Sequence, residues 1–405
     1  MVRLVFLGCL AYLTIGLGQL VVGAVMEPMV HAYGVQYGDG GQLVMNQFLG
    51  GLIGTLCAPW LMNRLGKRKL LLGALACMLV AEFSYTLLPS WGVMLAIAPV
   101  AGFGFGITEP TVGSFIISSA GPRANTAMSR VEVFFGAGAL IMPFVGALLI
   151  NIEQWRWAFG LVGALAALTL LLWAVFWPSI LNRPSSDAEA AQGEGGEAPA
   201  ARRSLLGSGP ARTVLLACAA FFAVYVGFEM SFAHYLPSLL VQGSGLSDAS
   251  ATLALSVFWG AMTIGRLFSG QLADRWGGSV YLLAMCGAAA VMFVLMGALG
   301  GGASAMFVLA FGAGLAMSGM FAVALVFANR SAPGMTERTT SLLMAFGLLG
   351  GAVLPKGTGW FLDQHGVDAT RWMLAVVAVL MLAIIFAAAA ASRSARQSGL
   401  HPKGI

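Results

Sequence analysis

The chain has 405 residues, of which 59% are hydrophobic and only 9% are charged. Soluble globular proteins carry far more charge, so this composition excludes that class and indicates an integral membrane protein. The net charge is +5, but the basic residues are scattered and form no patch with aromatic residues, which argues against nucleic-acid binding. The five cysteines lie in apolar runs without metal-ligand spacing, so we expect no metal site and no cofactor.

Long apolar blocks, separated by short polar connectors, follow one another along the chain. They are too long and too continuous for the alternating strands of a membrane barrel, so each predicts a bilayer-spanning helix. The first block is longer than the apolar core of a secretory signal and lacks a typical cleavage site, so we expect a retained span. Twelve spans are predicted, at about residues 5–32, 41–63, 69–88, 92–119, 125–150, 156–181, 211–242, 249–273, 279–299, 303–329, 338–362 and 371–392.

Lysine and arginine are distributed unevenly among the connectors. NRLGKRK (63–69) and DRWGG (274–278) are basic, whereas 31–41 and 241–248 contain neither residue. Cytoplasmic connectors of membrane proteins carry an excess of positive charge. We therefore predict a multi-pass protein of the inner (plasma) membrane with both termini in the cytoplasm.

Residues 182–210 form a long hydrophilic stretch rich in Ala, Gly, Ser, Pro and mixed charge. This composition predicts a flexible cytoplasmic linker between two six-helix bundles, 1–181 and 211–396, with 397–405 as a cytoplasmic tail. Two pairs of segments echo each other at nearly the same offset: PWLMNRLGKRK with GQLADRWGGS, and FGAGALIMPFVG with FGLLGGAVLPKG. A duplicated bundle is typical of a transporter whose site lies between the repeats.

The segment GQLADRWGG resembles the G-x3-D-R-x-G loop signature of the major facilitator superfamily through Gly270, Asp274, Arg275 and Gly277. The first copy departs from the signature, with Pro59 for Gly and Asn63 for Asp. The resemblance covers essentially the whole chain. It implies the major facilitator fold, an all-α integral membrane protein with 12 transmembrane helices in two pseudo-symmetric six-helix bundles.

The Asp/Arg pair of this signature could latch adjacent helices at the cytoplasmic mouth in one state and release them in another. Orientation in the membrane is the alternative, which explains Lys67 to Lys69 but not the placement of Asp274. Glu132 lies one or two turns inside the cytoplasmic end of its span, as expected for a gate charge. The residues assigned to the cytoplasmic latch are Asn63, Arg64, Arg130, Glu132, Arg266, Asp274 and Arg275.

Within the superfamily, the closest likeness is to the fucose/proton symporter group. AVMEPMV and GFGFGITEPTVGSF resemble segments in which that group has a carboxylate in its first and fourth spans, and YVGFEMSFAHYLPSLL resembles its seventh span. The likeness implies proton-coupling and substrate-binding roles for Glu27 and Glu109. Sugar ligands vary within the group, so the likeness does not give the substrate.

An ionised carboxylate in hydrocarbon is costly, so an intramembrane Glu faces a cavity, pairs with a cation or stays protonated. A Glu that binds a proton on one side and releases it on the other acts as a proton carrier. Pro28 and Pro110 each follow a Glu and free the carbonyls of Ala24 and Gly106. Such carbonyls are expected to line water or ligand, unless the prolines only kink the helices for packing.

The seventh span carries Glu229 with Tyr225 one turn earlier on the same face, and His234 on a different face. The Tyr/Glu pair could bind a hydroxylated ligand or a proton. Lys356, a lone cation in the apolar run of the eleventh span, could pair with Glu229 or extend outward to the interface. Further side chains that could bind a sugar-like solute are Gln19, Asn46, Gln47 and Trp259, although most membrane aromatics are packing residues or interfacial anchors. Glu82 receives no role.

The predicted function is a monomeric secondary active transporter that couples a small polar solute, such as a sugar, to protons by symport. The alternative is a proton-driven exporter of a drug-like or siderophore-like compound, because GAGALIMPFVGA partly resembles the antiporter signature, although Met142 replaces its Gly. A membrane receptor or scaffold would gain little from buried charge. No nucleophile, zinc, Walker or dinucleotide motif indicates an enzyme. Transport direction, and protons as opposed to sodium, are not readable from the sequence.

Overall fold

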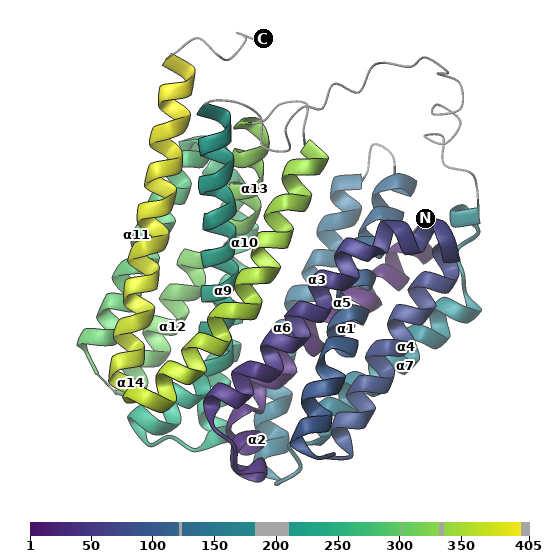
Figure 1. The fold of residues 1–405 in the computed structure, drawn as a ribbon, viewed down its shortest axis with the longest axis horizontal. Coiled ribbons are helices and arrows are strands. Elements are labelled where there is room, and N and C mark those ends of the chain that lie inside the picture. Colours follow the sequence, from purple (N-terminus) through teal and green to yellow (C-terminus); the bar gives the residue numbers. More distant parts are fainter. Residues whose placement is uncertain (121–123, 183–209, 301, 332–335, 398–405) are drawn as a thin grey trace. The chain divides into compact units, whose positions relative to one another are not determined.

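The structure is a computed structural model that describes residues 1–120, 124–182, 210–300, 302–331 and 336–397. Within these ranges all regular elements are helices (Figure 1). The predicted linker and tail lie outside the described residues, apart from their first or last residues.

The first half of the chain forms α1 (Val2–Ala24), α2 (Met26–Tyr33), α3 (Tyr37–Leu65), α4 (Lys67–Thr86), α5 (Trp91–Ala120), α6 (Ala124–Asn151), α7 (Trp157–Val175) and the short helix η2 (Ser179–Asn182). The second half forms α9 (Pro210–Ser244), α10 (Asp248–Trp276), α11 (Gly278–Ala298), α12 (Ala303–Met317), α13 (Met320–Ser331) and α14 (Thr336–Gln397).

The twelve predicted spans are all present as helices. Ten helices of the described residues are long and apolar enough to cross a membrane. α14 counts once among them, although Gly366 has a non-helical backbone with φ 76° and divides it into two helices. α3 covers the remaining predicted span, 41–63. In the first and tenth spans the helix is broken, so that α2 follows α1 and α13 follows α12.

The carbonyls that Pro28 and Pro110 were predicted to free are bound by threonines. Thr55 Oγ1 donates to Gly106 O at 2.8 Å. Thr252 Oγ1 lies 3.2 Å from Ala24 O and also donates to Asp248 O, within its own helix, at 2.8 Å. Threonine hydroxyls are one means by which a membrane protein satisfies backbone groups freed by proline. These two carbonyls therefore have protein partners, and a further role in lining water or ligand stays a prediction.

The chain divides into two compact units. Unit 1 contains Met1–Val21, Gly50–Ile141 and Arg156–Arg203. In it α4 packs against α5 and α7 around a core that includes Leu71, Leu75, Phe105, Phe115 and Trp173. Gly106 of α5 lies directly against Gly51 of α3, where a Cβ atom would overlap the facing backbone. Small residues allow membrane helices to approach this closely.

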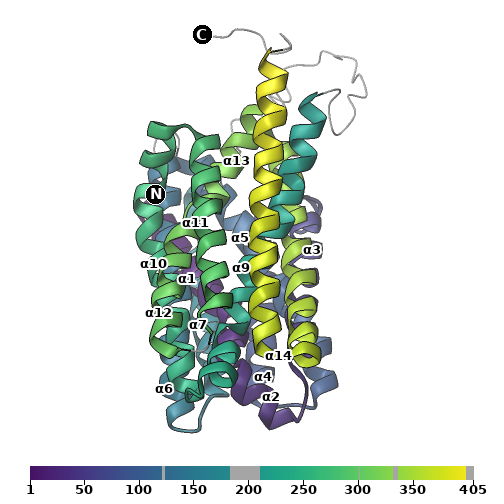
Figure 2. The same ribbon diagram turned by 90° about the vertical axis from the view of Figure 1, so that its left-hand side faces the viewer.

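Unit 2 contains Val22–Leu49, Met142–Trp155 and Ser204–Ile405. α14 runs beside α9 over much of its length, as Figure 2 shows. The aromatic rings of Phe228, Phe232 and Phe293 pack with centroids 4.5 and 4.7 Å apart, a spacing that favours edge and tilted contacts. Unit 2 thus includes two segments of the first half, Val22–Leu49 and Met142–Trp155, which the prediction assigned to the bundle 1–181. The division into bundles 1–181 and 211–396 stays a prediction.

The break in the tenth span also leaves carbonyls that tyrosines bind. Gly319 has φ 70°, which residues with a Cβ atom rarely adopt. Tyr281 donates its hydroxyl to Ser318 O at 2.7 Å, and Tyr225 donates to Met317 O at 3.2 Å. Because these carbonyls are paired inside the protein, the break is a stable feature of the helix at membrane depth.

Candidate functional site

Glu27 lies in the first turn of α2, directly after the break in the first span, and is 1% exposed. The Tyr37 hydroxyl donates a hydrogen bond of 2.9 Å to Glu27 Oε2. Glu27 Oε1 is buried without a hydrogen-bond partner among the described residues. Neither of the ion pairs found among those residues includes Glu27. Its negative charge would be uncompensated there, and binding a proton would remove that cost.

A polar face of α9 lies beside Glu27. Ser231, His234 and Ser238 follow the spacing i, i+3, i+7, so they share one face of the helix, and all three are buried. Ser238 lies next to the Glu27 carboxyl group and interacts with it. The hydroxyl of Ser231 has no partner in the described part of the chain, and His234 Nδ1 is 2.7 Å from Met230 O. Serine hydroxyls on the face of α9 beside a carboxyl group can bind a hydroxylated solute.

Glu229 lies on a different face of α9 from His234 and has a cation nearby. Arg266 Nη2 lies 4.0 Å from Glu229 Oε1, with Glu229 buried and the Arg266 side chain 35% exposed. Tyr225 also lies against this carboxyl group while donating to the backbone at the break in the tenth span. The geometry therefore places Arg266 with Glu229, whereas the sequence assigned Arg266 to the cytoplasmic latch with Asp274.

Lys356 does not form an ion pair with Glu229 among the described residues, since the cation near Glu229 is Arg266. The Lys356 side chain is half-buried, and its Nζ atom donates to Gly38 O at 2.8 Å, at the beginning of α3. The other alternative, a side chain that extends outward to the membrane interface, stays a prediction.

The other predicted contact residues of unit 2 lie on α3 and α10. Gln42 Nε2 donates to Asn46 Oδ1 at 2.9 Å, one turn apart on α3, and Gln47 is 8% exposed. Trp259 is buried, and its Nε1 donor has no partner among the described residues. These residues offer hydrogen-bonding groups to a polar solute.

Unit 1 holds the remaining membrane carboxylates and Gln19. Glu109 is half-buried on α5, close enough to Glu132 for the two like charges to repel, and its backbone oxygen accepts from the Tyr12 hydroxyl at 3.2 Å. Gln19 is half-buried on α1. Glu82 on α4 is 1% exposed, and its Oε2 is unpaired within the described ranges.

Residues 8–309 match the sequence profile of the Major Facilitator Superfamily. The chain belongs to this superfamily. It is a multi-pass membrane transporter and not an enzyme, as its relatives are transporters. The likeness to the fucose/proton symporter group stays a prediction, as do the roles it implies for Glu27 and Glu109.

Named relatives in the superfamily have different cargoes. The glucose/mannose transporter GlcP of Bacillus subtilis is 28% identical over 377 residues, which cover 92% of this chain and 91% of that protein. A probable multidrug-efflux transporter of Mycobacterium tuberculosis is 29% identical over 213 residues, covering 51% of this chain and 41% of that protein. The xylose transporter XylE from E. coli, in a partially occluded inward open conformation, matches the fold with a TM-score of 0.75 at 14% identity, covering 95% and 96% of the two chains.

The superfamily loop signature lies at the end of α10. Asp274 and Arg275 are exposed there, and neither forms an ion pair among the described residues. In unit 1, Asn63, Arg64, Arg130 and Glu132 are also exposed, and the Arg64 guanidinium lies 4.9 Å from the centroid of the Trp60 ring. The latch role of these residues stays a prediction.

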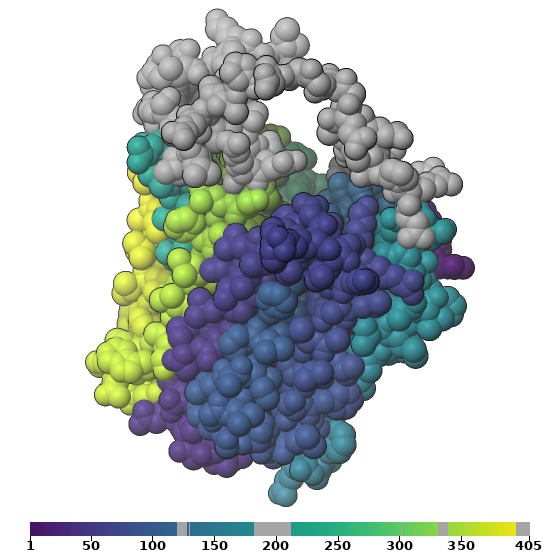
Figure 3. Space-filling model, turned by 45° about the vertical axis from the view of Figure 1, so that its right-hand side comes forward, coloured from purple at the N-terminus to yellow at the C-terminus, as the bar shows by residue number. Residues whose placement is uncertain are grey.

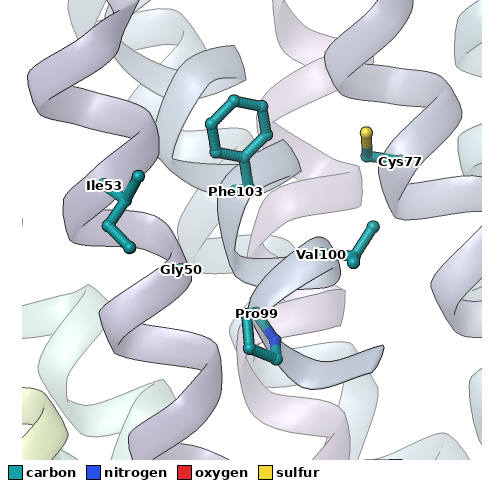
Figure 4. A pocket seen from close by; sticks show the side chains of 6 residues that line it. All are labelled: Gly50, Ile53, Cys77, Pro99, Val100 and Phe103. Atoms are coloured by element: carbon teal, nitrogen blue, oxygen red, sulfur yellow. The ribbon is translucent and has the colours of Figure 1, made fainter. Parts of the chain in front are cut away.

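An apolar groove lies in unit 1 between α3, α4 and α5. It is lined by Gly50, Ile53, Cys77, Pro99, Val100 and Phe103 (Figure 4). None of the predicted site residues lines it, and it offers no charged side chain. α3 lies in purple on the face shown in Figure 3, and two of its outward side chains near the groove are apolar, with Ile53 55% and Leu56 61% exposed. Such a surface suits acyl chains of the bilayer rather than a polar solute.

Proposed function

We propose that the protein is a secondary active transporter that carries a small polar solute of the sugar class together with protons, by alternating access. One observation carries the proposal: Glu27 is a buried carboxyl group with no ion-pair partner among the described residues, and the hydroxyls of Tyr37 and Ser238 lie beside it. The similarity to a glucose/mannose transporter along nearly the whole chain supports a sugar as the solute. Its proposed partners are the solute, protons and the bilayer of the plasma membrane, in which the monomer has both termini in the cytoplasm.

The three carboxylates predicted to bind protons or substrate have different parts in this proposal. Glu229 has Arg266 Nη2 4.0 Å from its Oε1, which accepts no hydrogen bond from the described residues, so the arginine offsets part of the cost of its charge and Glu229 serves the electrostatics of the α9–α10 contact. Glu27 and Glu109 have no such cation among the described residues, so they are the proton carriers. A proton bound to Glu27 would make the site neutral, and the solute would bind the protonated form more tightly. Solute and proton binding are thereby linked, as coupled transport requires.

The test is proton entry into proteoliposomes that contain a pH-sensitive dye, with a panel of hexoses and pentoses supplied outside. We expect acidification only with a transported sugar. Glu27→Gln should abolish sugar-driven acidification and retain exchange of labelled for unlabelled sugar. Glu153→Gln, at an exposed residue after α6, is the matched control and should behave as the wild type. Correctly inserted wild-type protein that admits no protons with any sugar would contradict the proposal.

A second candidate function is proton-driven export of a drug-like or siderophore-like compound. The partial match to a probable multidrug-efflux transporter favours it. Gene disruption distinguishes the two functions, because an exporter would leave the cell more sensitive to its compound, whereas a sugar symporter would leave it with slower sugar uptake.

A further inference from the structure

The first two residues of α3 are bound by three side chains from the second half of the chain, all within unit 2. Asp363 accepts from the amides of Tyr37, at 2.9 Å, and Gly38, at 2.6 Å. Lys356 donates to Gly38 O at 2.8 Å, and the Tyr235 hydroxyl donates to Tyr37 O at 2.8 Å. Both backbone donors and both backbone acceptors of this dipeptide are therefore paired across a long separation in sequence.

The charges at this contact complement the helix that they meet. The first amides of a helix have no partner within the helix and carry the positive end of its dipole, so a carboxylate such as Asp363 is stabilised there. Lys356 lies seven residues before Asp363 on α14, hence on the same face of that helix. Three of the four hydrogen bonds involve a charged group, and such bonds are the stronger ones.

Glycines allow the backbones to meet. A Cβ atom on Gly41 of α3 would lie 2.7 Å from the Tyr235 hydroxyl and 2.8 Å from Lys356 Cα. A Cβ atom on Gly359 of α14 would overlap Tyr37 O. The close approach of α3 and α14 at this contact therefore requires glycine at both positions, Gly41 on α3 and Gly359 on α14.

We propose that Asp363, Lys356 and Tyr235 form a releasable clasp on the Tyr37–Gly38 backbone, which holds the first-half segment Val22–Leu49 on the second-half helices and breaks once in each transport cycle. Alternating access moves one repeat against the other, so contacts between the halves at one membrane face must open when that face opens. The clasp lies on the side predicted to be extracytoplasmic, because its connector contains no Lys or Arg. Its bonds are to polar backbone groups, which water can bind once the contact opens. The Tyr37 hydroxyl also donates a hydrogen bond to the Glu27 carboxyl group and so connects the clasp with it. A role of this connection in transport rests on the proposed function.

Hydrogen exchange of the full-length protein in lipid nanodiscs tests whether the clasp holds. Asp363→Asn removes one acceptor oxygen and the charge, so exchange of the amides in residues 35–41 should accelerate about tenfold, the effect of losing one hydrogen bond to a charged group. Lys356→Met, which removes only the bond to Gly38 O, should accelerate it in the same direction. Asp368→Asn is the matched control, because Asp368 lies on the same element but is exposed and paired with Arg371. Unchanged exchange in both clasp variants would overturn the proposal.

A disulfide tests whether the clasp must open. A Cβ atom on Gly38 would lie 3.3 Å from Trp360 Cα, so the two backbones are close enough to test a cross-link between cysteines at these positions. In a background without the five natural cysteines, oxidised Gly38→Cys/Trp360→Cys should lose at least about tenfold in sugar exchange, and reductant should restore it. Cross-linked protein that exchanges sugar as fast as its reduced form would overturn the proposal. If the sugar class is wrong, the wild type also fails to exchange sugar, and the hydrogen-exchange result still decides whether the clasp holds the beginning of α3.

Discussion

Buried carboxyl groups in this chain differ in what compensates their charge. Glu229 has Arg266 at 4.0 Å, whereas Glu27 has one tyrosine hydroxyl, and each of the two carboxyl groups has one oxygen without a hydrogen bond among the described residues. A hydroxyl donor stabilises either form of a carboxyl group, but an arginine stabilises only the ionised form. Glu27 is therefore the group better suited to change its protonation state during transport. Glu82 is equally buried, and the structure shows no partner that explains it among the described residues.

Replacing Tyr37 by Phe should separate the role of this hydroxyl from that of the carboxyl group. Tyr37→Phe removes the hydrogen bond to Glu27 Oε2 and keeps the ring, while the backbone bonds to Asp363 and Tyr235 remain. We expect a loss of about 1–3 kcal/mol in the free energy of unfolding, because a buried acceptor loses its donor. Uphill uptake should fall and its pH profile should shift, because the Glu27 carboxyl group loses the hydrogen bond from the Tyr37 hydroxyl.

The measurement is sugar accumulation against external pH, with thermal unfolding in detergent alongside. Tyr85→Phe is the control: Tyr85 is a buried tyrosine of unit 1 whose hydroxyl donates to Met94 O at 3.4 Å. It should lose some stability without a shift of the pH profile. A Tyr37→Phe profile identical to that of the wild type would show that Glu27 does not depend on this hydroxyl.

At the scale of the helices, proline positions predicted which carbonyls are freed but not what binds them. Pro110 identifies Gly106 O from spacing alone, since the missing amide is four residues away. Thr55, which binds that carbonyl, is 51 residues away on another helix, and helix pairing is not encoded in local spacing. The same reason explains why the partner of Lys356 was not predicted. The unusual position of Lys356 in an apolar run was evident from the sequence. Its acceptor, however, is the backbone oxygen of Gly38, 318 residues away, and no side-chain pattern reveals a backbone acceptor.

The polar face of α9 is the opposite case, because the sequence contained its signal. Ser231, His234 and Ser238 follow helical spacing within an apolar run, and that spacing could have been read together with the Glu229 segment. Tyr37 had no such signal. It reaches Glu27 because the chain turns between α2 and α3, where Gly34 has φ 63°, and a turn of that kind is not visible as a periodic pattern.

Thr55 and Pro110 should be energetically coupled if the threonine compensates for the proline. Thr55→Val removes the hydroxyl that binds Gly106 O, with an expected cost of about 1 kcal/mol for a hydrogen bond inside a membrane protein. Pro110→Ala restores the amide that can bind Gly106 O within α5. In the Pro110→Ala background, Thr55→Val should therefore cost much less. A double-mutant cycle on unfolding free energies in detergent measures the coupling, and strictly additive values would refute the compensation.

For the whole molecule, coupled transport requires that a membrane carboxyl group change its proton occupancy as the site opens to alternate sides. With one proton per sugar, a gradient of one pH unit drives about tenfold accumulation, because each pH unit is worth about 1.4 kcal/mol.

Glu109→Gln keeps the size of the side chain and cannot carry a proton. We expect accumulation in this variant to fall to about the external concentration while exchange of labelled for unlabelled sugar persists, because exchange needs no net proton movement. Uptake into proteoliposomes, with and without a pH gradient, measures both quantities, and Glu153→Gln should retain both. If Glu109→Gln leaves accumulation and exchange unchanged, Glu109 carries no coupled proton. The repulsion between Glu109 and the neighbouring Glu132 would then have no effect on transport.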